Sequence, residues 1–165
     1  MAMSETLRQY FASRHIRYEM KWHPSSATSY QTALLAHVSP MQIAKPVILK
    51  NQFQHYVMAV VPAKSKLQVK IINEMLEHAF HLAKESELQA SFRDCELGAI
   101  PPVGQAYHMD TIVDDKLLAL DDVYLEGGDH EVLIHLHKED FALLMEGLMH
   151  DQITQLEPYG RFYYH

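Results

Sequence analysis

One stretch organises the sequence: Asp94-Cys95-Glu96-Leu97-Gly98-Ala99-Ile100-Pro101-Pro102-Val103-Gly104. It cannot form a helix, because two adjacent prolines remove two backbone donors and fix φ, and glycines stand on both sides. It is also unlike an ordinary solvated loop, since no charge follows Glu96 and most later residues are apolar. Such stiff backbone can grip a small ligand, with the N–H groups of Gly98, Ala99 and Ile100 converging on one anion. The alternative is a buried, proline-rich connector between a helix and a strand.

On either side of this stretch, hydrophobic periodicity predicts a mixture of helices and strands. The expected helical segments are residues 4–13, a segment capped by Ser25 or Ser26 with Leu34 on its apolar face, a turn begun by Pro40, residues 72–83, residues 87–92 and residues 141–148. The expected strands are residues 16–22 (half-buried), 47–49, 56–61, 66–69, 111–113, 123–125 and 132–136. Strands 47–49 and 56–61 form one predicted hairpin, and Gly127–His130 turns a second. Residues 151–165 carry no pattern that assigns them.

This order of elements favours the α+β class, because hairpin-like connections predominate and helices are interspersed irregularly. The length of 165 residues suits one domain with a proper core. We therefore expect a single domain over residues 1–165, with its core at about residues 16–148. Its sheet is expected to be mixed, largely antiparallel and curved, and to be flanked by helices.

The composition excludes several classes of protein. Cys95 is the only cysteine, so neither an internal disulfide nor a cysteine-built metal site can form. No apolar run approaches the roughly 18 residues of a membrane span, and the N-terminus lacks a signal-peptide pattern, so we expect a cytoplasmic protein. The twelve histidines fit no zinc spacing, although His135 and His137 alternate on a predicted strand, so no metal is expected.

The charge is distributed unevenly along the chain. The net charge is −7, yet residues 20–73 contain no acid and six lysines, and residues 74–165 hold 19 acids against five bases. Such asymmetry suggests a face that meets a phosphate backbone, and Lys50, Lys64, Lys66 and Lys70 are its candidate tRNA-binding residues. The alternative is a chance grouping of lysines on a solvated surface.

Four features far apart in sequence stand at the ends of predicted elements, where sites are commonly built: His23, Lys45, the loop 98–104 and the turn 127–130. Lys45 precedes Pro46 and an apolar strand. A lysine there can be partly desolvated and serve as a fixed cation for an ester or a phosphate. The alternative is a surface lysine at the start of a strand.

Together these features resemble the superfamily of YbaK and the prolyl-tRNA-synthetase-associated domain. The resemblance extends roughly from Ile16 to Leu148. The matching segments are His23 with Ala33, Gln42-Ile43-Ala44-Lys45, residues 56–63, residues 82–88 with Phe92, the stretch 94–104 with Gly98 and Pro102 as its Gly-x-x-x-Pro motif, and Gly127-Gly128 before His130.

The resemblance implies an enzyme: a free-standing aminoacyl-tRNA deacylase that hydrolyses the ester between a wrongly attached amino acid and its tRNA. Its implied partners are mischarged tRNA and an aminoacyl-tRNA synthetase, with no cofactor. Lys45 is implied as the catalytic residue. The implied substrate-binding residues are Gly98, Ala99, Ile100, Pro101, Pro102, Gly104, His130, His23 and Gly128. Many relatives have threonine where this chain has Pro46, which removes a donor and a hydroxyl beside the lysine.

The chemistry of this reaction requires no side-chain nucleophile. An aminoacyl ester is already activated, so a site needs mainly to hold the carbonyl, stabilise the oxyanion and admit water. The resemblance implies that the substrate's own ribose hydroxyl assists. Two alternatives stay open: a non-catalytic module of the same fold that binds tRNA or a synthetase, and a histidine-based metallohydrolase, which the lack of ligand spacing disfavours.

Overall fold

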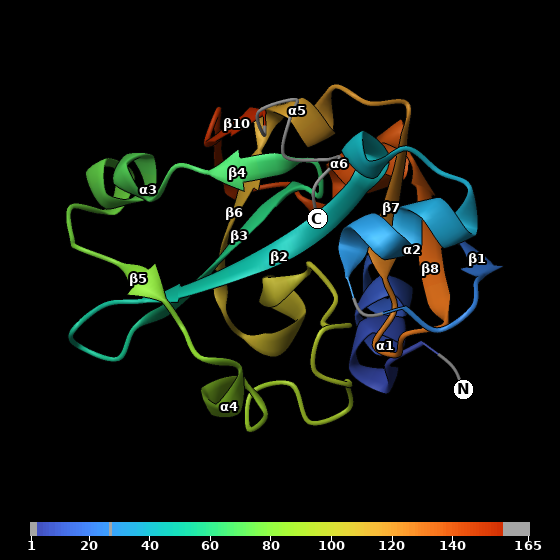
Figure 1. Cartoon of the computed structure of the whole chain (residues 1–165), viewed down its shortest axis with the longest axis horizontal. Helices are drawn as coiled ribbons and strands as arrows, with labels where there is room; N and C mark the ends of the chain where they lie inside the picture. Colours follow the sequence, from blue (N-terminus) through green and yellow to red (C-terminus); the bar gives the residue numbers. More distant parts are fainter. Residues whose placement is uncertain (1–2, 27, 157–165) are drawn as a thin grey trace.

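Both predicted hairpins form, and they lie side by side in one sheet (Figure 1). The first hairpin pairs β2 (Ile43–Lys50) with β3 (Tyr56–Pro62), and the second pairs β7 (Asp122–Glu126) with β8 (Val132–His137). β2 and β7 run parallel and pair only at residues 43–44 with 124–125. The computed structural model describes residues 3–26 and 28–156.

Within residues 3–26 and 28–156, the main sheet has eight strands in the order β1-β8-β7-β2-β3-β6-β9, with β5 paired to the outer end of β2. Among the described residues, β2/β7, β3/β6 and β6/β9 are parallel, and the other pairs are antiparallel. The remaining strands are β1 (Glu19–Trp22), β4 (Ser65–Leu67), β5 (His81–Leu82), β6 (Asp110–Asp114), β9 (Met149–Asp151) and β10 (Thr154–Leu156). β4 and β10 form a separate two-stranded sheet. The sheet is mixed, as expected for the α+β class.

Helices cover both faces of the sheet, and alternation along β3 divides the core between them. Met58 and Val60 face a large cluster with Phe11 and Phe141, whereas Val57, Ala59 and Val61 face a second cluster with Ile72. The helices are α1 (Glu5–Arg14), α2 (Ser29–Ala36), α3 (Val69–Leu76), α4 (Glu85–Leu88), α5 (Asp115–Leu118) and α6 (Lys138–Leu144), with short 3₁₀ turns at Pro40–Gln42 and Gly104–Tyr107. One α+β domain results.

Three predictions about single elements were wrong. The helix expected over residues 72–83 ends at Leu76, because Glu77 takes a left-handed φ of 57° and the chain turns back into β5. The strand expected over residues 16–22 begins only at Glu19, and all four residues of β1 are exposed, whereas Ile16 before it is buried in the core. Leu34 of α2 is 59% exposed instead of facing the core.

Several further predictions differ in their bounds. The helix expected over residues 141–148 is α6 at residues 138–144, and the strand expected over residues 66–69 is β4 at residues 65–67. α2 is capped by Thr28 rather than Ser25 or Ser26, and the helix expected over residues 87–92 is the shorter α4. β9 and β10 occupy part of the unassigned C-terminal region, whose residues 157–165 lie outside the described part of the chain.

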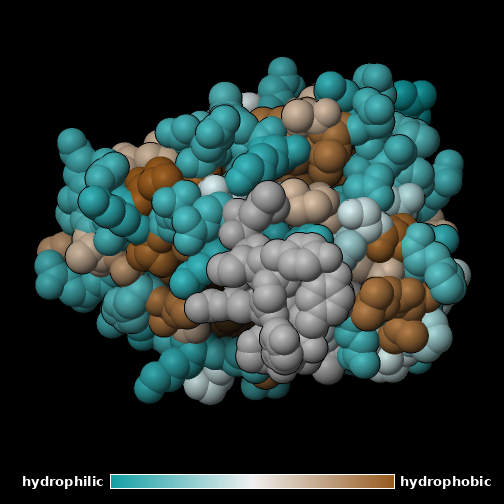
Figure 2. Space-filling view, turned by 45° about the horizontal axis from the view of Figure 1, so that its top comes forward, coloured by the Kyte–Doolittle hydropathy of each residue, from teal (hydrophilic) through white to brown (hydrophobic). Residues whose placement is uncertain are grey.

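The face shown in Figure 2 is mostly hydrophilic where it is coloured. On the part of the face coloured in Figure 2, apolar residues form separate groups among hydrophilic ones. Within residues 3–26 and 28–156, none of the helices combines the length and apolar character needed to cross a membrane.

Candidate functional site

A gap in the pairing of β2 opens the candidate site. One edge of β2 pairs with β7 at residues 43–44 and with β5 at residues 49–50. No strand is paired to that edge over residues 45–48, within the described part of the chain. Lys45 is half-buried and stands at the start of this gap. The sequence analysis predicted that Lys45 precedes a strand, but it lies inside β2.

Pro46 fits this gap for a backbone reason. In an antiparallel pair, the N–H and C=O groups of a residue point to one edge, and those of the next residue point to the other. The carbonyl of Ile48 faces the open edge, because it accepts a hydrogen bond from the N–H of Ala83 at 2.9 Å. The backbone groups of residue 46 therefore face that edge too, where a proline costs the β2/β3 ladder no donor.

A cleft lies along this edge, and its inner part is mostly apolar. This apolar compartment has a volume of about 310 Å³ and is lined by Ser29, Lys45, Pro46, Val47, Ile48, Leu82, Ala83, Glu85, Leu88, Leu97, Gly98 and Ile100. Three predicted site residues line it, and Lys45 is more than fifty residues away in sequence from the other two, Gly98 and Ile100. Apolar walls with a few polar groups are typical of small-ligand sites.

A second, more polar compartment continues from the first. Its volume is about 570 Å³, and it is lined by Ser25, Ser26, Gln31, Glu85, Leu97, Gly98 and His130. Glu85, Leu97 and Gly98 belong to both compartments. The cleft can therefore hold a ligand with an apolar group at one end and hydroxyl groups at the other.

The stretch 94–104 forms one wall of the cleft and is also a buried connector. Gly98, at a left-handed φ of 85°, and Ile100 line the cleft. The N–H of Ala99 is occupied by the carbonyl of Glu96 at 3.1 Å, so it does not join the predicted convergence of three donors. Residues 101–104 are buried behind the wall and do not line either compartment.

Gly104 has a packing role. A Cβ atom there would lie 2.3 Å from Oγ1 of Thr111, so only glycine lets the loop pack this closely against β6. Ala99, Pro101, Pro102 and Gly104, predicted to bind substrate, thus stand behind the cleft wall and not at its surface.

The turn of the second hairpin fastens this wall. The N–H of Glu96 donates to the carbonyl of Gly128 at 2.8 Å, and Nε2 of His130 lies 2.9 Å from the carbonyl oxygen of Leu97. Gly128 has a φ of 118°, and a Cβ atom there would lie 2.8 Å from Cβ of Ser4. Of the residues predicted in this turn, His130 faces the cleft and Gly128 supports the wall.

His23 is buried beside the cleft and does not line it. Its N–H donates to the carbonyl of Glu131 at 2.9 Å, which continues the β1/β8 pairing by one residue. Nδ1 lies 2.8 Å from the carbonyl oxygen of Pro24, and Nε2 has no hydrogen-bond partner among the described residues. The predicted substrate contact of His23 is thus not formed directly by the cleft surface.

A buried carboxylate stands behind the polar compartment. The hydroxyls of Ser26 and Thr32 are hydrogen-bonded to each other, and Oγ1 of Thr32 donates to Oε1 of Glu126 at 3.1 Å. Burial raises the pKa of Glu126 to about 7, against the smaller, opposing effect of the Thr32 hydrogen bond. Ser26 is therefore linked through Thr32 to a carboxyl group whose charge changes near neutral pH.

The thiol of Cys95 is unsuited to act as a nucleophile. Burial raises the pKa of Cys95 to about 12, so the thiol is neutral at pH 7. Its sulfur lies 3.1 Å from the hydroxyl of Tyr107, away from both compartments.

The four predicted tRNA-binding lysines lie in different surroundings. Lys50 is engaged in a 2.6 Å ion pair with Glu87, at the far end of β2 from Lys45. Lys64 follows β3 at the end where Ala63 donates to the carbonyl of Ile43, and so lies near the Lys45 end of β2. Lys66 in β4 and Lys70 in α3 are exposed.

The family model of the aminoacyl-tRNA editing domain matches residues 23–144, which hold both hairpins and both compartments. The chain belongs to the aminoacyl-tRNA editing domain family. Among solved structures, this editing domain is similar to "hypothetical protein APE2540", with a TM-score of 0.81 and 20% identity over 92% of this chain and 100% of the other. It is also similar to a protein proposed to be a trans-editing enzyme for prolyl-tRNA synthetase, with a TM-score of 0.76 and 19% identity over 93% and 99% of the two chains.

A third similar structure is larger. It is a protein from Marinobacter aquaeolei VT8 proposed to act in signal transduction, with a TM-score of 0.69 and 17% identity over 90% of this editing domain but only 30% of the other chain. At these identities, the likenesses establish the fold alone. No curated protein matches the chain.

Several lining residues of the editing domain were missed in the sequence analysis. Glu85, Ser25, Ser26 and Gln31 reach the cleft from α4, from the segment before α2 and from α2 itself. Ser25 and Ser26 were interpreted only as helix caps. The single signal for Glu85 was its place in segment 82–88, which carries part of the family resemblance.

Proposed function

We propose that this editing domain removes a wrongly attached amino acid from tRNA by hydrolysing the aminoacyl ester in trans. One observation carries the proposal: Lys45, Gly98 and His130, from three distant segments within the family match, line one continuous cleft. The chemistry of the two compartments suits the two ends of an aminoacyl-adenosine terminus. The amino-acid side chain would occupy the apolar compartment, and the ribose would face the serines and His130 of the polar compartment.

In this scheme Lys45 stabilises the negative charge that develops on the ester carbonyl oxygen. Its half-buried position at an apolar wall strengthens such an interaction relative to water. Water adds to the carbonyl carbon, the bond to the ribose oxygen breaks, and that oxygen leaves with a proton as a hydroxyl. The free amino acid is the other product.

Glu85 is placed to select the amino-acid end of the substrate. Glu85 lines both compartments, and a carboxylate at this place can pair with the ammonium group of an esterified amino acid. An ester lacking the amino group would lose this contact. We therefore assign Glu85 to substrate positioning and Lys45 to catalysis.

The test is release of labelled amino acid from a panel of mischarged tRNAs by the purified full-length protein. At least one tRNA should be deacylated well above the spontaneous rate, and the product should be the free amino acid with intact tRNA. If the protein binds charged tRNA but releases no amino acid from any member of the panel, it is a binding module of this fold and the hydrolytic proposal is wrong.

A further inference from the structure

A second group of chemically active side chains lies outside the cleft. His135 and His137 project from the same face of β8, and Asp122 of β7 stands opposite His137 in the antiparallel β7/β8 pair. Oδ1 of Asp122 lies 2.8 Å from Nε2 of His135 and 3.2 Å from Nδ1 of His137. Within the described residues this is the only group of three such side chains whose possible ligand atoms all lie within 4.8 Å of one another.

The geometry of the group is set by the strands that carry it. All three side chains come from paired strands and none comes from a loop. Antiparallel pairing fixes which of these residues stand opposite each other. The ring of Tyr124 stacks on His135 with centroids 4.5 Å apart and planes inclined by 11°. This stacking restricts the orientation of the imidazole and keeps Nε2 directed at Asp122.

The other nitrogen of His135 also has a carboxylate beside it. Nδ1 lies 3.7 Å from Oε2 of Glu19, which stands opposite His135 on β1. Histidines that bind metals through one nitrogen commonly have a carboxylate near the other, which fixes the tautomer and raises the basicity of the ligand. Asp122, His135 and His137 are thus placed like metal ligands, and Glu19 is placed like the carboxylate that supports one of them.

We propose that Asp122, His135 and His137 bind one divalent transition-metal ion of the Zn²⁺ type. Two neutral imidazoles and one carboxylate are the donors that such borderline ions prefer, and they leave positions open for water. The carboxylate brings a negative charge, and the ion takes the place of the protons that now link the three groups. Harder ions such as Mg²⁺ prefer all-oxygen sites and are not expected to bind here.

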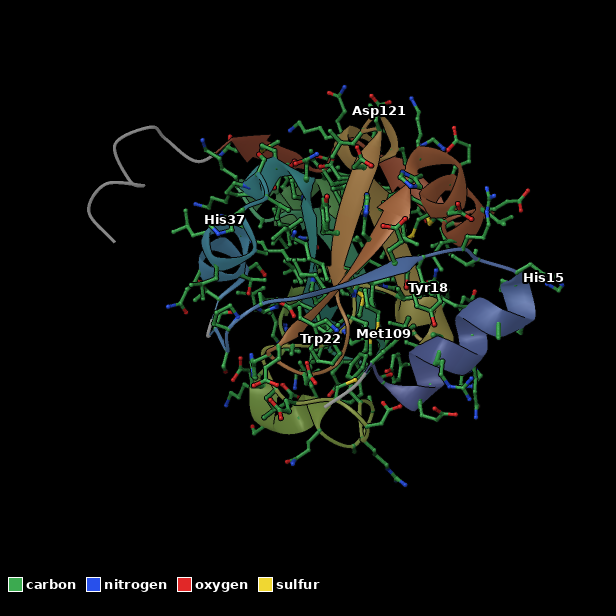
Figure 3. All side chains as sticks on the ribbon, turned by 90° about the vertical axis from the view of Figure 1, so that its right-hand side faces the viewer. His15, Tyr18, Trp22, His37, Met109 and Asp121 are labelled. Carbon is green, nitrogen blue, oxygen red and sulfur yellow. The ribbon has the colours of Figure 1, made fainter. Side chains whose placement is uncertain are left out.

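This site is separate from the cleft and independent of the proposed function. His130, at the cleft, precedes β8, whose six residues extend about 20 Å at roughly 3.3 Å per residue. Figure 3 looks onto this side, with Asp121 marking the start of β7 and Trp22 marking the other end of the β1/β8 pair. The sequence showed no zinc spacing, because one of the three ligands comes from a neighbouring strand.

The test is calorimetric titration of the full-length, tag-free protein with Zn²⁺, together with the visible absorption spectrum of the Co²⁺ complex. Asp122→Asn and His137→Ala each remove one ligand. His55→Ala is the matched control, because His55 pairs with Asp110 at 2.7 Å without a third ligand among the described residues. Circular dichroism without metal establishes that each variant is folded, and all changed side chains are at least partly exposed.

Wild type should bind one equivalent of Zn²⁺ per chain and give a Co²⁺ spectrum with bands of a site containing nitrogen ligands. Each ligand variant should weaken Zn²⁺ binding by more than about tenfold, since even the loss of an outer partner costs 10–100-fold. His55→Ala should stay within about twofold of wild type. Absence of saturable Zn²⁺ binding to the wild type, or equal binding by wild type and both folded ligand variants, would overturn the proposal.

Discussion

The two hairpins of the sheet are alike in topology and opposite in chemistry. In the first, β3 is buried along nearly its whole length, and the cleft receives one charged group from the strand pair, Lys45. The second hairpin carries acids and histidines at both of its ends, including the buried Glu126. They touch through a parallel pairing of only two residues on each strand, and the cleft opens beyond it.

This difference indicates that the two hairpins have different roles in the fold. The first hairpin gives a rigid apolar wall whose single lysine is fixed by the strand. The second contributes the buried Glu126, whose pKa burial raises to about 7, and the three side chains that we propose to bind a metal ion. Four predictions, taken from the largest expected effect to the smallest, test whether this division is correct.

Lys45→Ala should lower the rate of deacylation by ~10²–10³, because one oxyanion or positioning contact is typically worth that much. The free energy of unfolding should change little, since the side chain is only half-buried. The measurement is single-turnover release of labelled amino acid. Lys21→Ala, an exposed lysine on β1, is the control and should match wild type. A wild-type rate in folded Lys45→Ala would mean that Lys45 of the first hairpin is not catalytic.

Glu126→Gln tests the titrating character of the second hairpin. Because the folded pKa of Glu126 is raised from 4.5 to about 7, the native state binds more protons than the unfolded state between these values. The contribution of Glu126 to the free energy of unfolding is therefore fully present below pH 4.5 and is lost as the pH rises through 7. Glutamine keeps the shape without the charge, so the variant should gain at most about 3 kcal/mol over wild type at pH 8 and little at pH 4.5.

Urea denaturation of both proteins at pH 4.5, 6 and 8 measures this difference. Glu146→Gln, at an exposed carboxylate, is the control and should remain parallel to wild type. If the stability of Glu126→Gln depends on pH in the same way as that of wild type, the pKa of Glu126 is not raised in the folded protein.

Lys64→Glu with Lys66→Glu should raise the KM for charged tRNA about tenfold while kcat changes less than twofold. These lysines follow the first hairpin near the Lys45 end and can neutralise phosphates without touching the ester. Single changes to alanine should flatten the plot of log affinity against log salt by about one unit or less. A minimal aminoacyl ester should be hydrolysed at the wild-type rate by all these variants. Unchanged tRNA binding at low salt would mean that tRNA docks elsewhere.

Cys95→Ser should have the smallest effect, less than about threefold in rate, because the raised pKa of Cys95 excludes a resting thiolate and the sulfur does not line the cleft. Thermal unfolding provides the control for a folding defect. Complete loss of turnover in a folded variant would replace the lysine scheme with a cysteine nucleophile.

Much of the sheet could be predicted because its signals are local. Short apolar runs bounded by turn residues, together with the glycines of turn 127–130, were enough to define both hairpins. The end of α3 could not be predicted, since Phe80 continues the helical apolar spacing but becomes buried through a turn. There, the N–H of Phe80 donates to Oδ1 of Asn73 at 2.8 Å, a contact that spacing alone cannot reveal.

The site was predictable where residues carry an unusual backbone or an isolated charge. Lys45, Gly98 and His130 were named in advance and lie at the cleft. Ala99 and Gly104 were named for the same loop, but their packing behind the wall depends on β6 and on the turn within the loop. Glu85 and Ser26 reach the cleft only through tertiary contacts, so apart from the family resemblance of segment 82–88, nothing in their own segments identifies them as cleft residues.

The strand order has a consequence for how the chain is made. β1 is an edge strand that, among the residues the structure describes, pairs with β8, more than a hundred residues later. At roughly 5–20 residues per second, a ribosome needs on the order of 5–25 s to synthesise the intervening segment. During that interval Met20 and Trp22 remain without their strand partner, separated by Lys21 and preceded by Glu19. Such charges discourage pairing with other chains, so the alternation that predicted a half-buried strand also protects the nascent protein from aggregation.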